Sequence, residues 1–173
     1  MRIPKFPQVK QLFDYDCGAK SLEAVFLYYG LDEDYEKIIR VAGTGNNGTT
    51  VKGMESCLKH FRFDFLSKKM SIAELKRLIK RKVPVIVLLQ AWPGKEVSDW
   101  KNTWDTGHYV VVVGANKRKV FFEDPWCEPL SFLTWQELEE RWHDLVRGRK
   151  YRQHGIAVFG RKDHLPNTAI HMD

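Results

Sequence analysis

The sequence predicts one α+β domain in which amino-terminal helices pack on a mostly antiparallel sheet. Apolar residues recur at helical spacing mainly within residues 1–82, whereas short β-branched or aromatic runs separated by turns dominate residues 83–162. The chain has 173 residues, 43% of them hydrophobic, which is enough for one full core and short for two. We therefore expect a single two-layered domain over residues 1–173, with a short tail at residues 163–173.

Three helices are expected in the first third of the chain. Residues 19–29 carry apolar side chains at helical spacing, and Gly30 then offers a left-handed stop. Residues 32–42 predict a short amphipathic helix. Thr50 can cap a third helix, whose apolar residues are Val51, Met54, Leu58 and Phe61.

The glycine-rich segment at residues 43–50 separates the second and third of these helices. It lacks the Lys-Ser/Thr pair of a P-loop, and it follows a helix instead of a strand. We therefore expect a structural loop and no phosphate site.

Strands are expected from residue 61 onward. Residues 61–66 alternate as in a strand, and a helix then begins at Ser71 with Glu74 in the capping-box position. Four further strands are expected at residues 83–89, 109–114, 120–123 and 156–159. A last helix, from Thr134 to about Val146, separates the third and fourth of these strands.

The net charge of +6 favours acidic partners in general. The densest basic stretches, residues 76–82 and 147–152, fall on an expected helix and an expected loop, and aromatic residues are poorly interleaved with them. We interpret both stretches as solvated faces and expect no nucleic-acid partner.

The sequence also predicts a cytoplasmic location. The longest apolar run, residues 83–89, contains a proline and falls far below the roughly 18 to 20 residues of a membrane span, and residues 1–7 do not resemble a secretory signal. Cys17, Cys57 and Cys127 are widely spaced and form no Cys-x-x-Cys pair. This spacing indicates reduced thiols and argues against a disulfide framework or a zinc site.

The densest chemical signal is Gln-Leu-Phe-Asp-Tyr-Asp-Cys-Gly at residues 11–18. Cys17 stands at the expected start of the first helix, where unpaired backbone N–H groups and the positive end of the helix dipole favour a thiolate. Gln11 lies close enough before it for its amide N–H to join the Cys17 N–H around a developing oxyanion.

Two further residues complete a possible thiol-protease site. His108 opens an expected strand directly after Gly107, and Asp124 closes the next strand before Pro125. The turn at residues 115–119 joins the two strands, so both side chains lie near the same end of a hairpin. A thiol protease requires a nucleophile, an imidazole, a group that orients the imidazole and oxyanion donors, and these four residues supply one candidate for each role.

With these residues, the chain resembles the bacteriocin-processing double-glycine leader peptidases. These are papain-like cysteine proteases best known as amino-terminal domains of peptide-exporting transporters. The similar segments are residues 11–30, the Gly-Thr pairs at 43–44 and 48–49, and residues 84–87, 107–111, 124–125 and 133–142. The resemblance implies a papain-like fold with Cys17 as nucleophile, His108 as general base and acid, Asp124 as the orienting group and Gln11 as oxyanion donor.

The resemblance also implies a substrate class and a partner. Family members cut leader peptides after Gly-Gly through a cysteine thioester, with no metal or organic cofactor, and often within a peptide-export transporter. Because the chain ends after one domain, we expect a stand-alone member of the family unless the chain is a fragment. A peptide-export transporter, if it is a partner, is then expected to be a separate protein. Double-glycine specificity and coupling to export are not assumed.

The segment at residues 92–106 precedes His108 and carries three tryptophans. Two interpretations stay open: a lid or peptide-binding wall, or a loop whose tryptophans tuck against the sheet. Trp104, Gly107 and Trp126 are the candidate substrate-binding residues, and Trp126 is also expected to cover the His108 and Asp124 pair. Lys20 is expected to reach solvent, with support of the thiolate as the alternative.

Other functions of the same residues also stay open. A papain-like site supports transpeptidase or amidase chemistry when the thioester meets a different acceptor. A non-catalytic peptide-docking module is known among relatives without the cysteine, and the presence of Cys17 argues against it.

Overall fold

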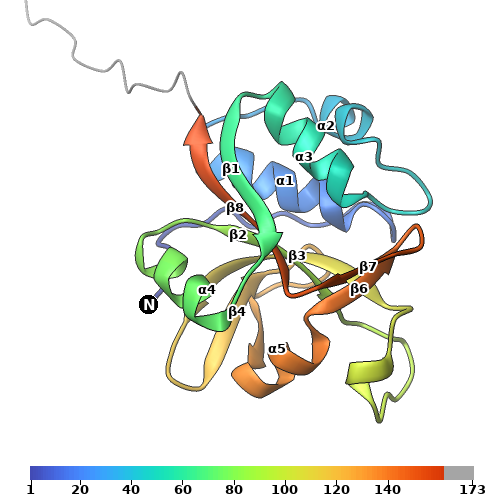
Figure 1. Cartoon of the computed structure of the whole chain (residues 1–173). Helices are drawn as coiled ribbons and strands as arrows, with labels where there is room; N and C mark the ends of the chain where they lie inside the picture. Colours follow the sequence, from blue (N-terminus) through green and yellow to red (C-terminus); the bar gives the residue numbers. More distant parts are fainter. Residues whose placement is uncertain (162–173) are drawn as a thin grey trace, which may run out of the picture.

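A six-stranded antiparallel sheet forms the centre of the molecule, which we describe from a computed structural model over residues 1–161 (Figure 1). The strand order is β1-β8-β2-β3-β4-β5, and every pairing is antiparallel. These strands are β1 (Phe63–Lys69), β2 (Val85–Gln90), β3 (Gly107–Ala115), β4 (Lys119–Glu123), β5 (Ser131–Thr134) and β8 (His154–Arg161). The expected tail at residues 163–173 lies outside the described residues.

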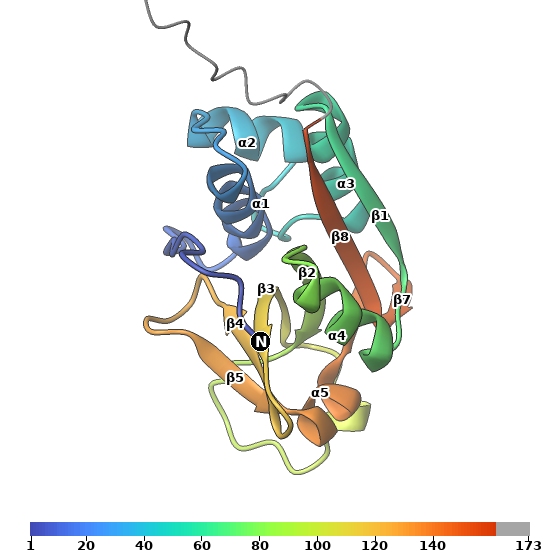
Figure 2. The ribbon, with the colours of Figure 1, turned by 90° about the vertical axis from the view of Figure 1, so that its left-hand side faces the viewer.

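Helices cover both faces of the sheet (Figures 1 and 2). On one face lie α1 (Cys17–Tyr28), α2 (Tyr35–Ala42) and α3 (Val51–His60), and on the other lie α4 (Ile72–Lys80) and α5 (Trp135–Arg141). The expectation of two layers was therefore wrong, although the α+β class with amino-terminal helices on an antiparallel sheet is confirmed. The reason is that β2 and β3 are buried on both faces and require a second helical cover.

Each face of the sheet has its own core. Leu22, Phe26 and Ile86 belong to the core under α1 to α3, whereas Leu75 and Val87 belong to the core under α4 and α5. Successive residues of β2 thus alternate between the two cores, as the strand period of two requires.

Local capping signals in the sequence are confirmed in detail. The Thr50 side chain accepts a hydrogen bond from the Gly53 N–H at the start of α3. Ser71 and Glu74 form a reciprocal capping box at α4. Each side chain satisfies a backbone donor that the helix itself leaves unpaired.

The last helix is shorter than the sequence predicted. It ends at Arg141, and residues up to Val146 form β6 (His143–Val146), which pairs with β7 (Arg149–Arg152) in a two-stranded hairpin. Trp142 explains the break, because its fully buried ring donates a hydrogen bond from Nε1 to the His154 carbonyl and so fixes the chain where the helix would have continued. The basic stretch expected on a loop lies in this hairpin.

The segment between β2 and β3 packs against the protein. It contains one short 3₁₀ turn, Trp100–Asn102, and the Trp100 ring lies under the Arg141 guanidinium at 3.7 Å. The Trp104 ring lies 4.4 Å from the His143 ring of β6. Of the two interpretations of this loop, the tucked arrangement describes these two tryptophans.

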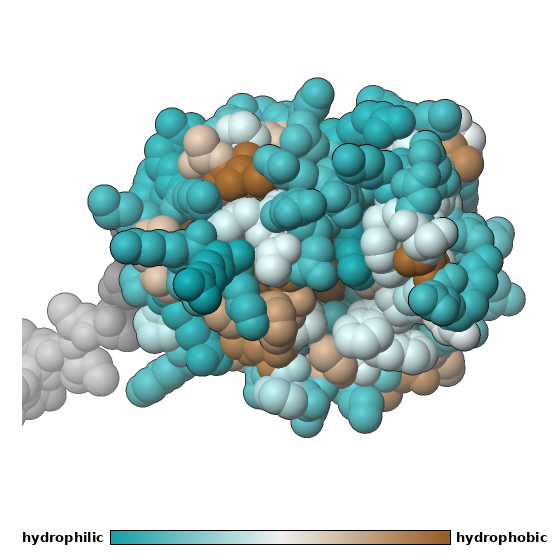
Figure 3. Space-filling view, turned by 90° about the horizontal axis from the view of Figure 1, so that it is seen from below, coloured by the Kyte–Doolittle hydropathy of each residue, from teal (hydrophilic) through white to brown (hydrophobic). Residues whose placement is uncertain are grey.

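The surface is mainly hydrophilic on the face that carries α5, with smaller apolar areas between polar side chains (Figure 3). No helix within residues 1–161 is long and apolar enough to cross a membrane.

Truncation of the Leu22 side chain is expected to weaken the packing of α1 against the core and so to destabilise the protein. Leu22 is fully buried, so Leu22→Ala should lower the free energy of unfolding by about 2–5 kcal/mol. Leu66 is 43% exposed on β1, and Leu66→Ala is the control, with an expected change within about 0.5 kcal/mol. Urea denaturation measures both, and equal losses would contradict this account of the core.

Candidate active site

Cys17 is the first residue of α1, and the residue before it shapes the helix start. Asp16 occupies the N-cap position, but its side chain makes no capping hydrogen bond to the helix. Its fully buried carboxylate instead accepts hydrogen bonds from the N–H groups of Leu12 and Phe13 and from the Tyr35 hydroxyl. The first N–H groups of α1 have no intrahelical partner, so they remain available to an oxyanion beside the Cys17 sulfur.

Close packing holds this helix start in place. A Cβ atom at Gly18 would lie 2.7 Å from the Thr49 side chain and 3.2 Å from the Tyr109 ring. Only a glycine lets the first turn of α1 approach residue 49 and β3 this closely. The glycine after the cysteine therefore sets the distance between α1 and the sheet.

His108 and Asp124 meet at the end of the β3–β4 hairpin, as the sequence predicted. His108 Nε2 lies 2.7 Å from Asp124 Oδ1, and both side chains are buried. Because Asp124 occupies Nε2, Nδ1 is the ring nitrogen left for the Cys17 sulfur. The site thus brings Cys17, His108 and Asp124 together from α1, β3 and the end of β4.

The electrostatics of the site favour a protonated imidazole. Burial alone would lower the pKa of His108, but its hydrogen bonds to Asp124 and Cys17 and their negative charges raise this pKa to about 9. Burial would raise the pKa of Asp124, yet the hydrogen bond and the charge of His108 outweigh it and hold this pKa below its ordinary value. The pair therefore carries an imidazolium and a carboxylate at neutral pH.

Trp92 is a site residue that the sequence did not single out. Its indole Nε1 donates a hydrogen bond of 3.1 Å to Asp124 Oδ2, while the Trp126 backbone N–H donates one of 3.0 Å to Oδ1. Trp126 was expected to cover the pair with its ring, but that ring is 49% exposed and lines a separate small cavity with Gln11. Trp92 and Asp124 are far apart in the sequence, and no local pattern predicts that their side chains meet.

Gln11 lies against the segment that follows Asp124. Its backbone N–H donates to the Pro125 carbonyl at 2.8 Å, and its side-chain Nε2 donates to the Phe13 carbonyl at 2.8 Å. Within residues 1–161 its Oε1 is buried without a hydrogen-bond partner. The unused atom is an acceptor, the Nε2 donor is already bonded to Phe13, and Gln11 does not line the cavity beside Cys17. An oxyanion would therefore take up the second N–H of this amide.

A cavity of about 330 Å³ opens beside Cys17. Its walls come from residues 47–49, from Leu88, Gly107 and Tyr109 of the sheet, and from residues 144–147 of the β6–β7 hairpin. Its lining contains both hydrophobic and polar groups, and the Tyr109 hydroxyl is buried with no partner among the described residues. We call this space the Cys17 cavity.

Gly107 is required by a close contact in the same cavity. A Cβ atom at this position would lie only 2.1 Å from Asp144 Oδ2. Gln90 holds the Asp144 carboxyl through a hydrogen bond of 2.7 Å, and its own amide oxygen accepts from the Thr106 N–H. This buried network joins β6 to the residues immediately before His108.

The structure contradicts two other expectations from the sequence, which concern Trp104 and Lys20. Trp104 packs against the β6–β7 hairpin through His143, Lys150 and Arg152, and it does not line the Cys17 cavity. Lys20 does not reach solvent: it is buried, pairs with Glu23 at 2.6 Å and lies 3.5 Å from the centre of the Tyr35 ring. No group of three or more metal-ligating side chains occurs within residues 1–161.

The family model described as the Peptidase C39 family matches residues 5–146. The chain belongs to this family. Its members are cysteine peptidases, so the convergence of Cys17, His108 and Asp124 is the arrangement that this C39 peptidase is expected to use.

Curated relatives of this C39 peptidase are larger proteins. The Lactococcin transport/processing ATP-binding protein LcnC-like of Lactococcus lactis subsp. lactis (strain IL1403) is 26% identical over 127 residues, which cover 72% of this chain and 16% of the relative. The Pediocin PA-1 transport/processing ATP-binding protein PedD of Pediococcus acidilactici is 25% identical over 115 residues, 66% of this chain and 14% of the relative. The chain thus spans about a sixth of their length.

Solved structures share the fold. The peptidase domain of Streptococcus ComA, a bi-functional ABC transporter involved in quorum sensing, matches with a TM-score of 0.69 and 20% identity, over 90% of this chain and 99% of that chain. A putative C39-like peptidase from Bacillus anthracis has the same TM-score and identity over 92% and 97% of the two chains. A double glycine motif protease from an AMS/PCAT transporter, in complex with the leader peptide, has a TM-score of 0.63 and 18% identity over 91% and 92%.

Iodoacetamide is expected to label Cys17 before the other two cysteines near pH 7. Burial raises the pKa of Cys57 to about 12, and burial with nearby acidic groups raises that of Cys127 to about 11, so both remain unreactive thiols. Peptide mapping by mass spectrometry after limiting alkylation measures the order. Equal or slower labelling of Cys17 would contradict an activated thiolate.

The titration of His108 tests the electrostatics directly. Because its pKa is raised from 6.5 to about 9, the protonated ring stabilises the fold fully below about pH 6.5, and this contribution is lost as the pH rises through about 9. NMR titration should find His108 charged at pH 7.5, and Asp124→Asn should lower its pKa. His154 is the internal reference, because burial lowers its pKa. A neutral His108 at pH 7 would contradict the imidazolium–carboxylate pair of His108 and Asp124.

Proposed function

We propose that this C39 peptidase is an endopeptidase that cuts peptide leaders, or similar flexible glycine-containing segments, through a Cys17 thioester. The observation that supports it most is the 2.7 Å contact between His108 and Asp124 beside the cysteine that begins α1. In this proposal Cys17 is the nucleophile, His108 the general acid and base, Asp124 the orienting group and Gln11 an oxyanion donor.

The first step forms an acyl-enzyme. The Cys17 thiolate attacks the scissile carbonyl carbon, and the resulting oxyanion accepts hydrogen bonds from the N–H groups at the start of α1 and from the Gln11 amide. The His108 imidazolium then gives its proton to the leaving amine as the C–N bond breaks. This leaves a thioester on Cys17 and a neutral imidazole.

The second step returns the enzyme to its starting state. The neutral His108 ring takes a proton from water, whose oxygen attacks the thioester carbonyl, and the C–S bond breaks to release the carboxylic acid and the Cys17 thiolate. Asp124 keeps the ring oriented and stabilises its positive charge through both steps. The Trp92 indole, bonded to the other Asp124 oxygen, fixes that carboxylate in turn.

The substrate class is inferred from the family. The double glycine motif protease named above was solved with a leader peptide, and the curated relatives are transport/processing proteins. We infer that glycines precede the cut bond here as well, and that a peptide-export transporter is a candidate partner. The three free cysteines support a reducing compartment, and so a cytoplasmic location.

Peptide cleavage tests this function. A peptide with Gly-Gly in its middle should be cut after the second glycine, and Cys17→Ala should lower kcat by at least about a thousandfold. Cys57→Ala is the matched control, because Cys57 is a buried cysteine of α3 outside the site. Mass spectrometry locates the cut, and a peptide with Ala-Ala in place of Gly-Gly measures the preference.

The same assay separates the alternatives. Cleavage of other peptides but not of Gly-Gly would reject the leader specificity and keep the protease. A product joined to an added amine instead of water would indicate transpeptidation. Full cleavage by Cys17→Ala would reject the proposed nucleophile.

A further inference from the structure

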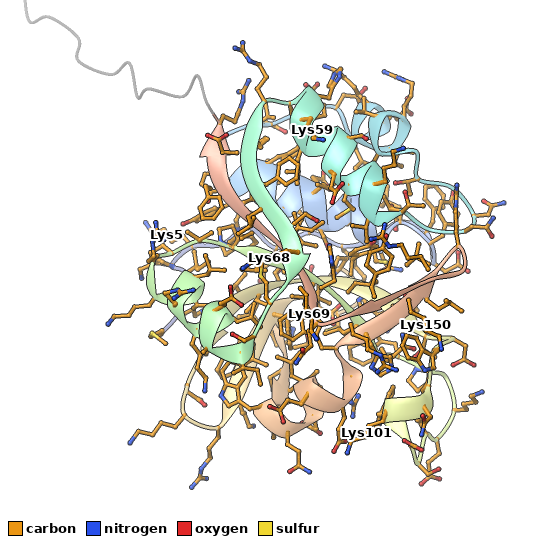
Figure 4. All side chains as sticks on the ribbon, viewed as in Figure 1. Lys5, Lys59, Lys68, Lys69, Lys101 and Lys150 are labelled. Carbon is orange, nitrogen blue, oxygen red and sulfur yellow. The ribbon has the colours of Figure 1, made fainter. Side chains whose placement is uncertain are left out.

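A second cavity, of about 630 Å³, lies beside the Cys17 cavity and is lined mainly by cations. The start of α3, the end of β1 and the β7 strand form its walls. Its cationic residues are Lys52, Lys68, Lys69, Arg149, Lys150 and Arg152, and Glu55 is the one acidic residue of its lining. We call it the basic cavity. Figure 4 shows Lys68, Lys69 and Lys150 around the junction of β1 with the hairpin.

Most of this positive charge is not neutralised within the protein. Lys68 pairs with Glu74 at 2.6 Å. For the other five cations, the described part of the chain places no carboxylate within ion-pair distance. His154, which also lines the cavity, adds no charge at neutral pH because burial lowers its pKa. A concave wall with a surplus of one charge sign focuses the electrostatic field on a ligand of opposite charge.

The two cavities have no lining residue in common, but neighbouring residues of two segments line both of them. Thr49 and Arg147 line the Cys17 cavity, whereas Val51 and Arg149 line the basic cavity. In each segment, the residue that lines one cavity and the residue that lines the other are two positions apart in the sequence. Three or four residues of extended peptide span about 10–14 Å, so a peptide held at Cys17 reaches the basic cavity within a few residues.

We propose that the basic cavity binds an acidic segment of the peptide substrate, a few residues from the bond that Cys17 cuts. This inference rests on the proposed peptidase function. Arg149 offers a planar guanidinium group suited to Asp and Glu carboxylates, and Lys52 and Lys69 add point charges. The charged groups of Lys150 and Arg152 lie over the Trp104 ring, which is outside this lining, so they add to the positive field of the cavity and are not its direct ligands. An acidic peptide fits better than a nucleic acid, since Tyr151 is the only aromatic ring that lines the cavity beside His154, and single strands require stacking platforms.

Matched peptides test the docking. A Gly-Gly peptide with Asp and Glu a few residues away from the cut bond should have about tenfold higher kcat/KM than the same peptide with Asn and Gln, mainly through KM. The advantage should shrink as NaCl rises from about 0.05 to about 0.5 M. Lys52→Glu with Lys69→Glu should abolish it and favour a peptide with Lys at the acidic positions.

The control variant carries the same charge change elsewhere. Lys59 and Lys101 are exposed and lie apart from the cavity in Figure 4, so Lys59→Glu with Lys101→Glu should keep the acidic preference. A milder variant, Lys52→Gln with Lys69→Gln, should lose most of the preference for the acidic peptide. It replaces the glutamate variant in the test if the glutamate variant does not fold. Thermal melting checks that each variant is folded.

A binding assay separates this inference from the proteolytic function. Fluorescence anisotropy of the labelled acidic peptide with Cys17→Ala should show binding that the cavity pair weakens and the Lys59 and Lys101 pair does not. If that holds and wild type cuts no peptide, the docking stands and the proposed function fails. Equal kcat/KM for acidic and neutral peptides, equal effects of the two variant pairs, or equally tight binding of a single-stranded DNA of the same charge would each overturn the docking.

Discussion

The position of Cys17 depends on the tight packing of the first turn of α1 against residue 49 and β3. Gly18 allows this approach, since any side chain there would overlap Thr49. The same strand carries His108, so the contact that buries α1 also sets the sulfur opposite the imidazole. The fold and the site are therefore held by one interface, and they are not separable contributions to the structure.

Buried charge is the second constraint, and the protein compensates for it locally. Asp16, Asp124 and Asp144 are all nearly inaccessible to water, and each carboxyl accepts hydrogen bonds from backbone or side-chain donors. A buried carboxylate without such partners would be strongly destabilising. Each of these groups also fixes a segment beside the site: Asp16 the loop before Cys17, Asp124 the His108 ring, and Asp144, through Gln90, the backbone at Thr106.

The β6–β7 hairpin links the site to the rest of the surface. Its paired strands bring Asp144 opposite Tyr151 and Val146 opposite Arg149. One strand therefore contributes to the Cys17 cavity and the other to the basic cavity. A single hairpin thus borders both the cavity beside the proposed nucleophile and the cavity proposed to bind acidic residues.

Much of the structure follows from local sequence signals. Thr50, the Ser71 and Glu74 pair, and Gly30 and Gly43 with their positive φ angles mark helix ends through contacts within a few residues. The proximity of His108 and Asp124 also follows from the sequence, because one short turn joins their strands. Such features need no knowledge of the remaining fold.

The sequence by itself thus determined the α+β class, the helix starts and the identity of the proposed nucleophile, imidazole and orienting carboxylate. Tertiary structure alone decided the second helical layer, the early end of α5, the burial of Lys20 and the hydrogen bond from Trp92 to Asp124. The physical reason is range: caps and turns are satisfied by neighbours along the chain, whereas these four outcomes depend on which distant surfaces meet when the sheet is covered on both faces.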